Sequence, residues 1–318
     1  MLRKFAYNRI FRTTGMLLLL LLLLLFPASK KYSLEEEKTV KTSNTMEKKE
    51  VFLIDKYGYV ARCKVPLTYN DDIDYAKKLI ELLINDGKYQ QNIPNGFKAI
   101  LPSTTKINDV TKTDDTITID LSNDILELNK ENGKRAIEAL VYNLTTINNI
   151  KFVYIKVEGK DLNNIPGTNI ILSQPLSRKQ GINTNYDAFN YKNATLTTIY
   201  FIGENNNSYY YIPVSKISND NRDKIEIIID ELTSSHIYET NLMSFLNYNT
   251  KLINYELKDG ILTLDFNNYL FDDVENKNIL EEVIYSISLS VRDNYDVEEV
   301  IFTVNGDEIS KSVLKNIE

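Results

Sequence analysis

The sequence predicts an α+β protein built from two tandem copies of one small domain, and three observations support this prediction. The pattern Ile-Thr-Ile-Asp-Leu-Ser-Asn-Asp at 117–124 returns as Leu-Thr-Leu-Asp-Phe-Asn-Asn-Tyr at 262–269. Residues 153–159 match residues 300–306 in the same way. Strand-like alternation and helix-like periodicity follow the same order in both halves. Because the repeated unit has the length of a domain, we expect two tandem domains and not a solenoid.

Residues 1–28 have the pattern of a targeting segment, because basic residues such as Arg3 and Arg12 precede an unbroken leucine run at 17–25. As a helix, the apolar run spans roughly 16 Å, well short of the ~30 Å hydrocarbon core of a bilayer. The segment is therefore either a signal peptide or a short uncleaved anchor. In both cases the chain that follows is exported. Residues 29–49 are charged and non-periodic, which predicts a flexible tether.

The first copy, residues 50–162, opens with two apolar strands around Lys56-Tyr57-Gly58. Asn70 or Asp71 can cap the helix that follows, because a short polar side chain there accepts from free backbone N–H groups. Apolar residues then recur at helical spacing twice in this copy. The predicted order is a strand at 51–55, a strand at 59–65, a helix from about 71, a hairpin at 107–112 and 116–121, a helix around 136–147 and a strand at 152–157.

The second copy, residues 196–312, follows the same course. Its hairpin turns at Lys258-Asp259-Gly260, and Asp-Gly between apolar runs is a strong turn signal. The connector, residues 163–195, is too apolar at 170–172 for a free linker, so we expect it to pack on one or both domains. The predicted order is a strand at 198–203, a strand at 209–214, a helix from about 220, a hairpin within 252–265, a helix around 279–287 and a strand at 300–304.

Each copy therefore has the predicted order β-β-α-β-β-α-β. Its two helices are amphipathic, so each must bury an apolar stripe against a sheet. This requirement predicts an α+β layer in which both helices of a copy pack on one face of its sheet.

The composition excludes several classes of function. With 43% hydrophobic and 25% charged residues the chain is ordinary globular material, and its net charge of −7 argues against a nucleic-acid partner. The chain has one Cys, one His and no Trp. Cys63 has no partner for an intramolecular disulfide, and its place in an alternating strand predicts a buried thiol.

No set of residues predicts catalysis, a metal site or a cofactor. His236 follows two serines, but no third group is spaced to orient it as a general base, so we expect a helix-end residue. Asp120 and Asp265 occupy the same repeat position in different copies, which favours turn bonding or cross-strand pairing over a pair of acids. Glycines are scattered singly, so no phosphate-binding loop is present.

The tyrosines are the better indication of function. The chain has 21, and Tyr209, Tyr210 and Tyr211 form a run. Tyrosine is enriched at protein interfaces, which makes this run a candidate interface. Strands also favour tyrosine, so packing within the fold is the alternative.

These elements together resemble the GerM domain family of sporulation and spore germination proteins. The resemblance covers roughly residues 51–310 and rests on several short motifs that occur in the same order in both copies. In the first copy, residues 119–122 match the second strand of the family's hairpin, but Asp114-Asp115 stands where the family has a tip glycine. The matching residues are Leu101 and Pro102 before the first hairpin, Asp120 in its second strand, Leu252, Asp259, Gly260 and Asp265 in the second copy, and 174–178 with 181–183 in the connector.

The resemblance implies a fold similar to ring-building motifs, small α+β domains that assemble laterally, and a non-enzymatic role. The family's lipid-attachment cysteine is absent here, so lipid anchoring is not implied. We expect an extracytoplasmic protein, held at the membrane through its N-terminal segment, that assembles with itself or with other cell-envelope and sporulation proteins. The alternative is a binding module for a cell-wall fragment or germinant, which would need a pocket in the cleft between the domains.

Overall fold

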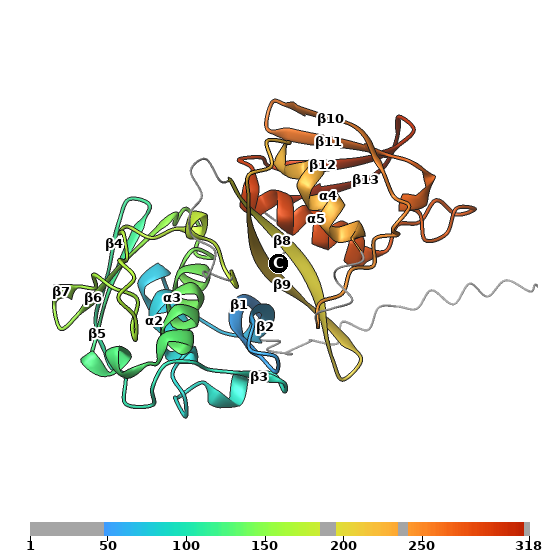
Figure 1. The fold of residues 1–318 in the computed structure, drawn as a ribbon. Coiled ribbons are helices and arrows are strands. Elements are labelled where there is room, and N and C mark those ends of the chain that lie inside the picture. Colours follow the sequence, from blue (N-terminus) through green and yellow to red (C-terminus); the bar gives the residue numbers. More distant parts are fainter. Residues whose placement is uncertain (1–47, 185–194, 235–240, 315–318) are drawn as a thin grey trace, which may run out of the picture. The chain divides into compact units, whose positions relative to one another are not determined.

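The computed structural model describes residues 48–184, 195–234 and 241–314, and these belong to one compact unit. The predicted leader 1–28, almost all of the tether 29–49 and His236 lie outside the described residues. The structure confirms the α+β class, and all fourteen predicted strands and helices, seven in each copy, are present (Figure 1). We call the part from β1 to β7 repeat one and the part from β8 to β13 repeat two.

Repeat one begins with a tight hairpin, β1 (Lys48–Asp55) and β2 (Val60–Pro66). Helix α2 (Asp72–Leu82) follows, and Asp71 caps it by accepting from the backbone N–H of Asp74. The short strand β3 (Phe97–Lys98) adds to the outer edge of β1. The remaining elements are β4 (Ile107–Thr113), β5 (Thr116–Leu121), α3 (Lys130–Leu144), β6 (Phe152–Val157) and β7 (Lys160–Asp161).

Repeat two has the same order with a longer opening hairpin, β8 (Thr195–Asn205) and β9 (Ser208–Ser218). Asp223 caps α4 through a hydrogen bond from the Ile225 backbone N–H. The elements after the hairpin are α4 (Lys224–Thr233), β10 (Leu252–Lys258), β11 (Ile261–Phe266), α5 (Glu281–Asn294), β12 (Glu299–Val304) and β13 (Asp307–Val313).

Each repeat contains a four-stranded sheet, in the order β4-β5-β6-β7 and β10-β11-β12-β13. Its second and third strands run parallel and are joined through a crossover helix, α3 or α5. The last strand of each sheet was not predicted, because β7 has only two residues and β13 is charged. Tight turns connect these last strands, and left-handed pairs at Glu158-Gly159 and Asn305-Gly306 suit such hairpin turns.

The opening hairpins do not join these four-stranded sheets. They contact the opposite side of the helices, so that α2 and α3 lie between hairpin β1–β2 and sheet β4–β7 (Figure 1). The physical reason is visible in α3, where every residue from 136 to 144 is buried. A helix buried on all sides needs a partner on each side, and the hairpin supplies the second one.

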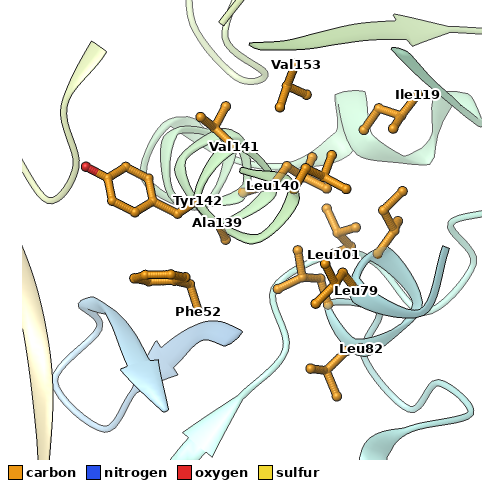
Figure 2. Close-up of a cluster of buried hydrophobic side chains, with 14 of the residues drawn as sticks. Phe52, Leu79, Leu82, Leu101, Ile119, Ala139, Leu140, Val141, Tyr142 and Val153 are labelled. Atoms are coloured by element: carbon orange, nitrogen blue, oxygen red, sulfur yellow. The ribbon is translucent and has the colours of Figure 1, made fainter. Parts of the chain in front are cut away.

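Repeat one has a continuous core in which α3 is central. Phe52 from β1 packs edge-on against Tyr142 of α3, with ring centroids 5.2 Å apart. Figure 2 shows this pair beside Leu140 and the buried side chains Leu79 and Val153. Repeat two has its own cluster around α5, β11 and β12. Cys63 is buried, as predicted, and burial raises the pKa of its thiol.

Helix side chains seal the outer edge of each opening hairpin. The Asn143 side chain accepts from the Phe52 N–H at 3.0 Å and donates to the Phe52 carbonyl at 2.7 Å. Asn294 of α5 brackets Thr198 of β8 in the same way. Each side chain occupies the backbone groups of one edge residue, Phe52 or Thr198, so no further strand can pair at that residue.

We expect Asn143→Ala to lower the free energy of unfolding by about 1–3 kcal/mol, because it leaves the buried N–H and carbonyl of Phe52 without partners. Asn143 is only 1% exposed, so water cannot replace the lost bonds. Urea denaturation measures the change. Asn132→Ala, near the start of the same helix, is the control and should change stability by about 0.5 kcal/mol or less. Equal effects of the two changes would contradict this account.

Candidate interaction surfaces

The two repeats share one sheet. Hairpin β1–β2 of repeat one and hairpin β8–β9 of repeat two form a five-stranded sheet in the order β3-β1-β2-β9-β8. The join lies between β2 and β9, where Arg62 pairs with Tyr211. A small apolar cluster of Ala61, Tyr210 and Ile212 covers it. The repeats therefore meet through backbone pairing and packing.

The tyrosine run lies at this join. Tyr210 is 7% exposed, and its hydroxyl donates to Asp55 of repeat one at 2.9 Å. Burial and the Asp55 carboxylate raise the pKa of Tyr210. Gly203 across the hairpin leaves room for its ring, since a Cβ there would come within 2.4 Å of it.

The other two tyrosines of the run point to the opposite face of β9. Tyr211 is half-buried and stacks on Tyr285 at 5.8 Å. Tyr209 is 48% exposed and meets Phe245 edge-on at 4.9 Å. Tyr210 thus contacts the other repeat and is closed to an outside partner, and Tyr209 is the member of the run that is open to one.

A buried group of charges spans the same join, and we call Glu50, Arg62, Arg178, Arg292 and Asp293 the junction cluster. Glu50 of β1 pairs with Arg62 at 3.1 Å and with Arg292 of α5 at 3.0 Å. The side chains of Glu50 and Asp293 are only 11% and 2% exposed. Charges this far from water need partners on every side, and here the partners come from both repeats.

Arg178 of the connector completes the junction cluster. One terminal nitrogen lies 2.8 Å from Asp293 of α5, and Nε donates to the Thr145 hydroxyl at 2.9 Å. The guanidinium also lies over the Tyr142 ring, 4.7 Å from its centroid. The Tyr200 hydroxyl donates to the second Asp293 oxygen at 2.7 Å. Connector, repeat one and repeat two are therefore held by one side chain.

The electrostatics of Glu50 follow from this arrangement. Burial alone raises the pKa of a carboxyl group, but Arg292, Arg62 and Arg178 outweigh burial here. They lower the pKa of Glu50 from its ordinary 4.5 to about 2. Glu50 is consequently ionised across the physiological range.

The connector packs on both repeats through amide side chains, as its apolar composition predicted. Gln174 accepts from the Ile155 N–H at 2.6 Å and donates to the Ile155 carbonyl at 2.8 Å, like an added strand residue. Asn183 bonds the Val60 N–H and carbonyl, both at 2.9 Å, and donates to Pro213 of β9 at 2.7 Å. The family resemblance includes residues 174–178 and 181–183 but gives them no role. In the structure, these residues join the connector to the two repeats.

The remaining motif residues take structural places. Asp120 accepts from the Gly159 N–H at 3.0 Å, and Asp265 accepts from the Gly306 N–H at 2.9 Å. Both thus bind the turn after the neighbouring strand. Asp259 and Gly260 are left-handed, with φ of 51° and 77°, as a tight hairpin turn requires. Leu101 is fully buried, whereas Pro102 and Leu252 are half-buried.

A pocket of about 230 Å³ lies within repeat one, between α3 and the connector. Ile137, Leu172 and Leu176 line it together with Glu138, which is 5% exposed. Burial raises the pKa of Glu138 to about 7, against the opposing effect of Lys134. The predicted alternative placed a ligand in the cleft between the repeats, and this pocket lies elsewhere.

The described ranges also bear on two other classes of function. Within residues 48–184, 195–234 and 241–314, no group of three or more His, Cys, Asp or Glu side chains is arranged to hold a metal ion. In those same ranges no helix has both the length and the apolar character needed to cross a bilayer.

The fold and the join define a protein of two tandem α+β repeats fused through a common sheet. The family model for sporulation and spore germination, Germane, matches residues 50–163 and 198–310. The spore germination protein GerM of Bacillus subtilis strain 168 is 35% identical over 286 residues, which cover 88% of this chain and 78% of the relative. The solved tandem GerMN domains of GerM from Bacillus subtilis match with a TM-score of 0.74 and 34% identity, over 82% of this chain and 92% of that one. The chain belongs to the GerM family.

Proposed function

We propose that this protein is a non-enzymatic interaction component of the cell envelope that acts in sporulation or spore germination. The observation that carries the proposal is the match to GerM along both repeats. Homology of this extent supports a role in one of these processes, while the assembly role is our inference.

The geometry favours a scaffold over a device that opens and closes. A shared sheet and buried ion pairs join the repeats, which makes relative movement of the two costly. Tyr209 is a solvent-exposed aromatic residue beside Phe245 on the rigid strand β9. Exposed aromatic side chains on rigid elements are the kind of residue that dominates binding energy at interfaces.

The leader and the tether supply the location in this proposal. A basic front followed by a short leucine run directs export, and the polar stretch up to residue 49 gives the repeats reach from the membrane surface. An outward-facing protein held near a membrane needs partners on the same side. We therefore expect those partners to be other envelope proteins or further copies of this chain.

Deletion of the gene in its own organism tests the function. We expect fewer heat-resistant colonies after starvation, or a slower loss of optical density when spores germinate, and restoration of both by the unaltered gene. Unchanged spore counts together with unchanged germination would contradict the proposal. A photo-cross-linking residue at Tyr209, compared with one at exposed Tyr57 on repeat one, tests whether partners contact β9.

A further inference from the structure

The two four-stranded sheets differ at their outer edges. Within the described ranges no strand pairs with the outer edge of β4 or of β10. Both strands contain a bulge at the same repeat position. Unpaired N–H and C=O groups along a strand are a template for another strand, so the side chains decide whether such an edge is protected.

The edge of repeat one carries polar residues. Lys112 of β4 lies opposite Ile117 and forms an ion pair with Asp72 of α2, with Nζ and Oδ2 2.6 Å apart. Lysine on an edge strand disfavours pairing because its charge would have to be desolvated. Asn108 occupies the bulge.

The edge of repeat two carries apolar residues at the same two positions. Leu257 corresponds to Lys112, lies opposite Leu262 and is 56% exposed. Ile253 corresponds to Asn108 and is 55% exposed. Two exposed branched residues on an open strand are what a protected edge avoids, so the edge of β10 is less protected than that of β4, although it shares the bulge and carries Lys258.

We propose that β10 pairs antiparallel with β10 of a second copy of this chain, which rests on the assembly role proposed above and names its surface. The sequence of the strand is complementary to itself about Tyr255. In that register Ile253 of each copy faces Leu257 of the other. Apolar pairs across antiparallel strands stabilise pairing.

The proposed register also avoids repulsion. Glu256 faces Asn254, and Lys258 faces Leu252, so no like charges lie directly opposite one another. A two-fold contact of this kind closes on itself and yields a dimer, whose two sheets become one continuous sheet. One edge strand gives a small interface, so we expect association at roughly tens of micromolar and above. Tethering to a common membrane would raise the effective concentration.

Sedimentation velocity of residues 46–318, which form a compact unit of their own, tests the proposal across about 5 to 500 µM. We expect a monomer–dimer equilibrium. Leu257→Lys, which gives repeat two the residue that repeat one already carries, should raise the dissociation constant at least about tenfold. Ile171→Lys on the connector is the matched control, since Ile171 is 77% exposed and lines the pocket between α3 and the connector. It should leave the dissociation constant within about twofold.

Ile253→Lys provides a second measurement, because Ile253 is exposed and faces Leu257 in the proposed register, so this change should weaken the dimer as well. A monomer at every concentration, or a dimer that Leu257→Lys leaves unchanged, would overturn the proposal. Such a result would not contradict the proposed role in sporulation or germination, because gene deletion tests that role separately. If Leu257→Lys abolished the dimer but deletion of the gene had no phenotype, the proposed function would be overturned and the β10 contact would stand.

Discussion

Arg178→Ala should lower the free energy of unfolding by about 3–5 kcal/mol, because it removes one partner of a buried ion pair and leaves the other charge behind. That other charge is Asp293, whose side chain is 2% exposed and has little access to water. The change also removes the bond to the Thr145 hydroxyl and the stacking on Tyr142.

Chemical denaturation followed by circular dichroism measures this effect. Arg222→Ala is the matched control, since Arg222 also pairs with carboxylates but is 47% exposed, and it should cost about 1 kcal/mol or less. The loss of stability for Arg178→Lys should lie between those of the two alanine variants, because lysine keeps the positive charge but lacks the planar guanidinium group that bonds several partners at once. A change of under about 1 kcal/mol for Arg178→Ala would show that the junction cluster contributes little to stability.

Acid should weaken the protein through Glu50. Its pKa is about 2 in the folded state and 4.5 ordinarily, so the folded state binds the proton less readily. A group with a lowered folded pKa stabilises the fold fully above its unfolded pKa, and that stability is lost as the pH falls through the folded pKa. The window is therefore about pH 4.5 down to 2, and the contribution above it is roughly 3 kcal/mol.

Comparison of the unaltered protein with Glu50→Gln isolates this contribution from those of other carboxylates. Urea midpoints between pH 7 and pH 3 should show a steeper decline for the unaltered protein below about pH 4.5. At pH 7 the variant should be the less stable of the two, because three arginines lose their shared partner. Parallel curves for the two proteins would contradict the assigned role of Glu50.

Local signals sufficed to predict most elements. The strand β6 lies at the predicted residues 152–157, and the hairpin β10–β11 turns at Asp259-Gly260 as expected. These features depend on residues close in sequence, such as a left-handed turn between two apolar runs. The strand β7 escaped prediction because two residues carry no periodicity.

The join between the repeats could not be predicted from local signals. Glu50 and Arg292 are separated by most of the chain, and nothing near either residue indicates the other. The tyrosine run predicts an interface with a partner, which stays a prediction, while alternation along β9 directs Tyr210 inward to Asp55 of repeat one. The burial of every residue from 136 to 144 of α3, which requires partners on two sides of the helix, emerges only in the structure.

The shared sheet has a mechanical consequence. β1 begins at Lys48, within the last residues of the predicted tether 29–49, and Glu50 lies two residues further along. A pull on the tether would load β1 first, and β1 is held by hydrogen bonds to β2 along its length and by Glu50 to Arg292 of repeat two. Force arriving at one end of the chain would thus spread to both repeats at once, instead of unravelling the first while the second stays unstressed.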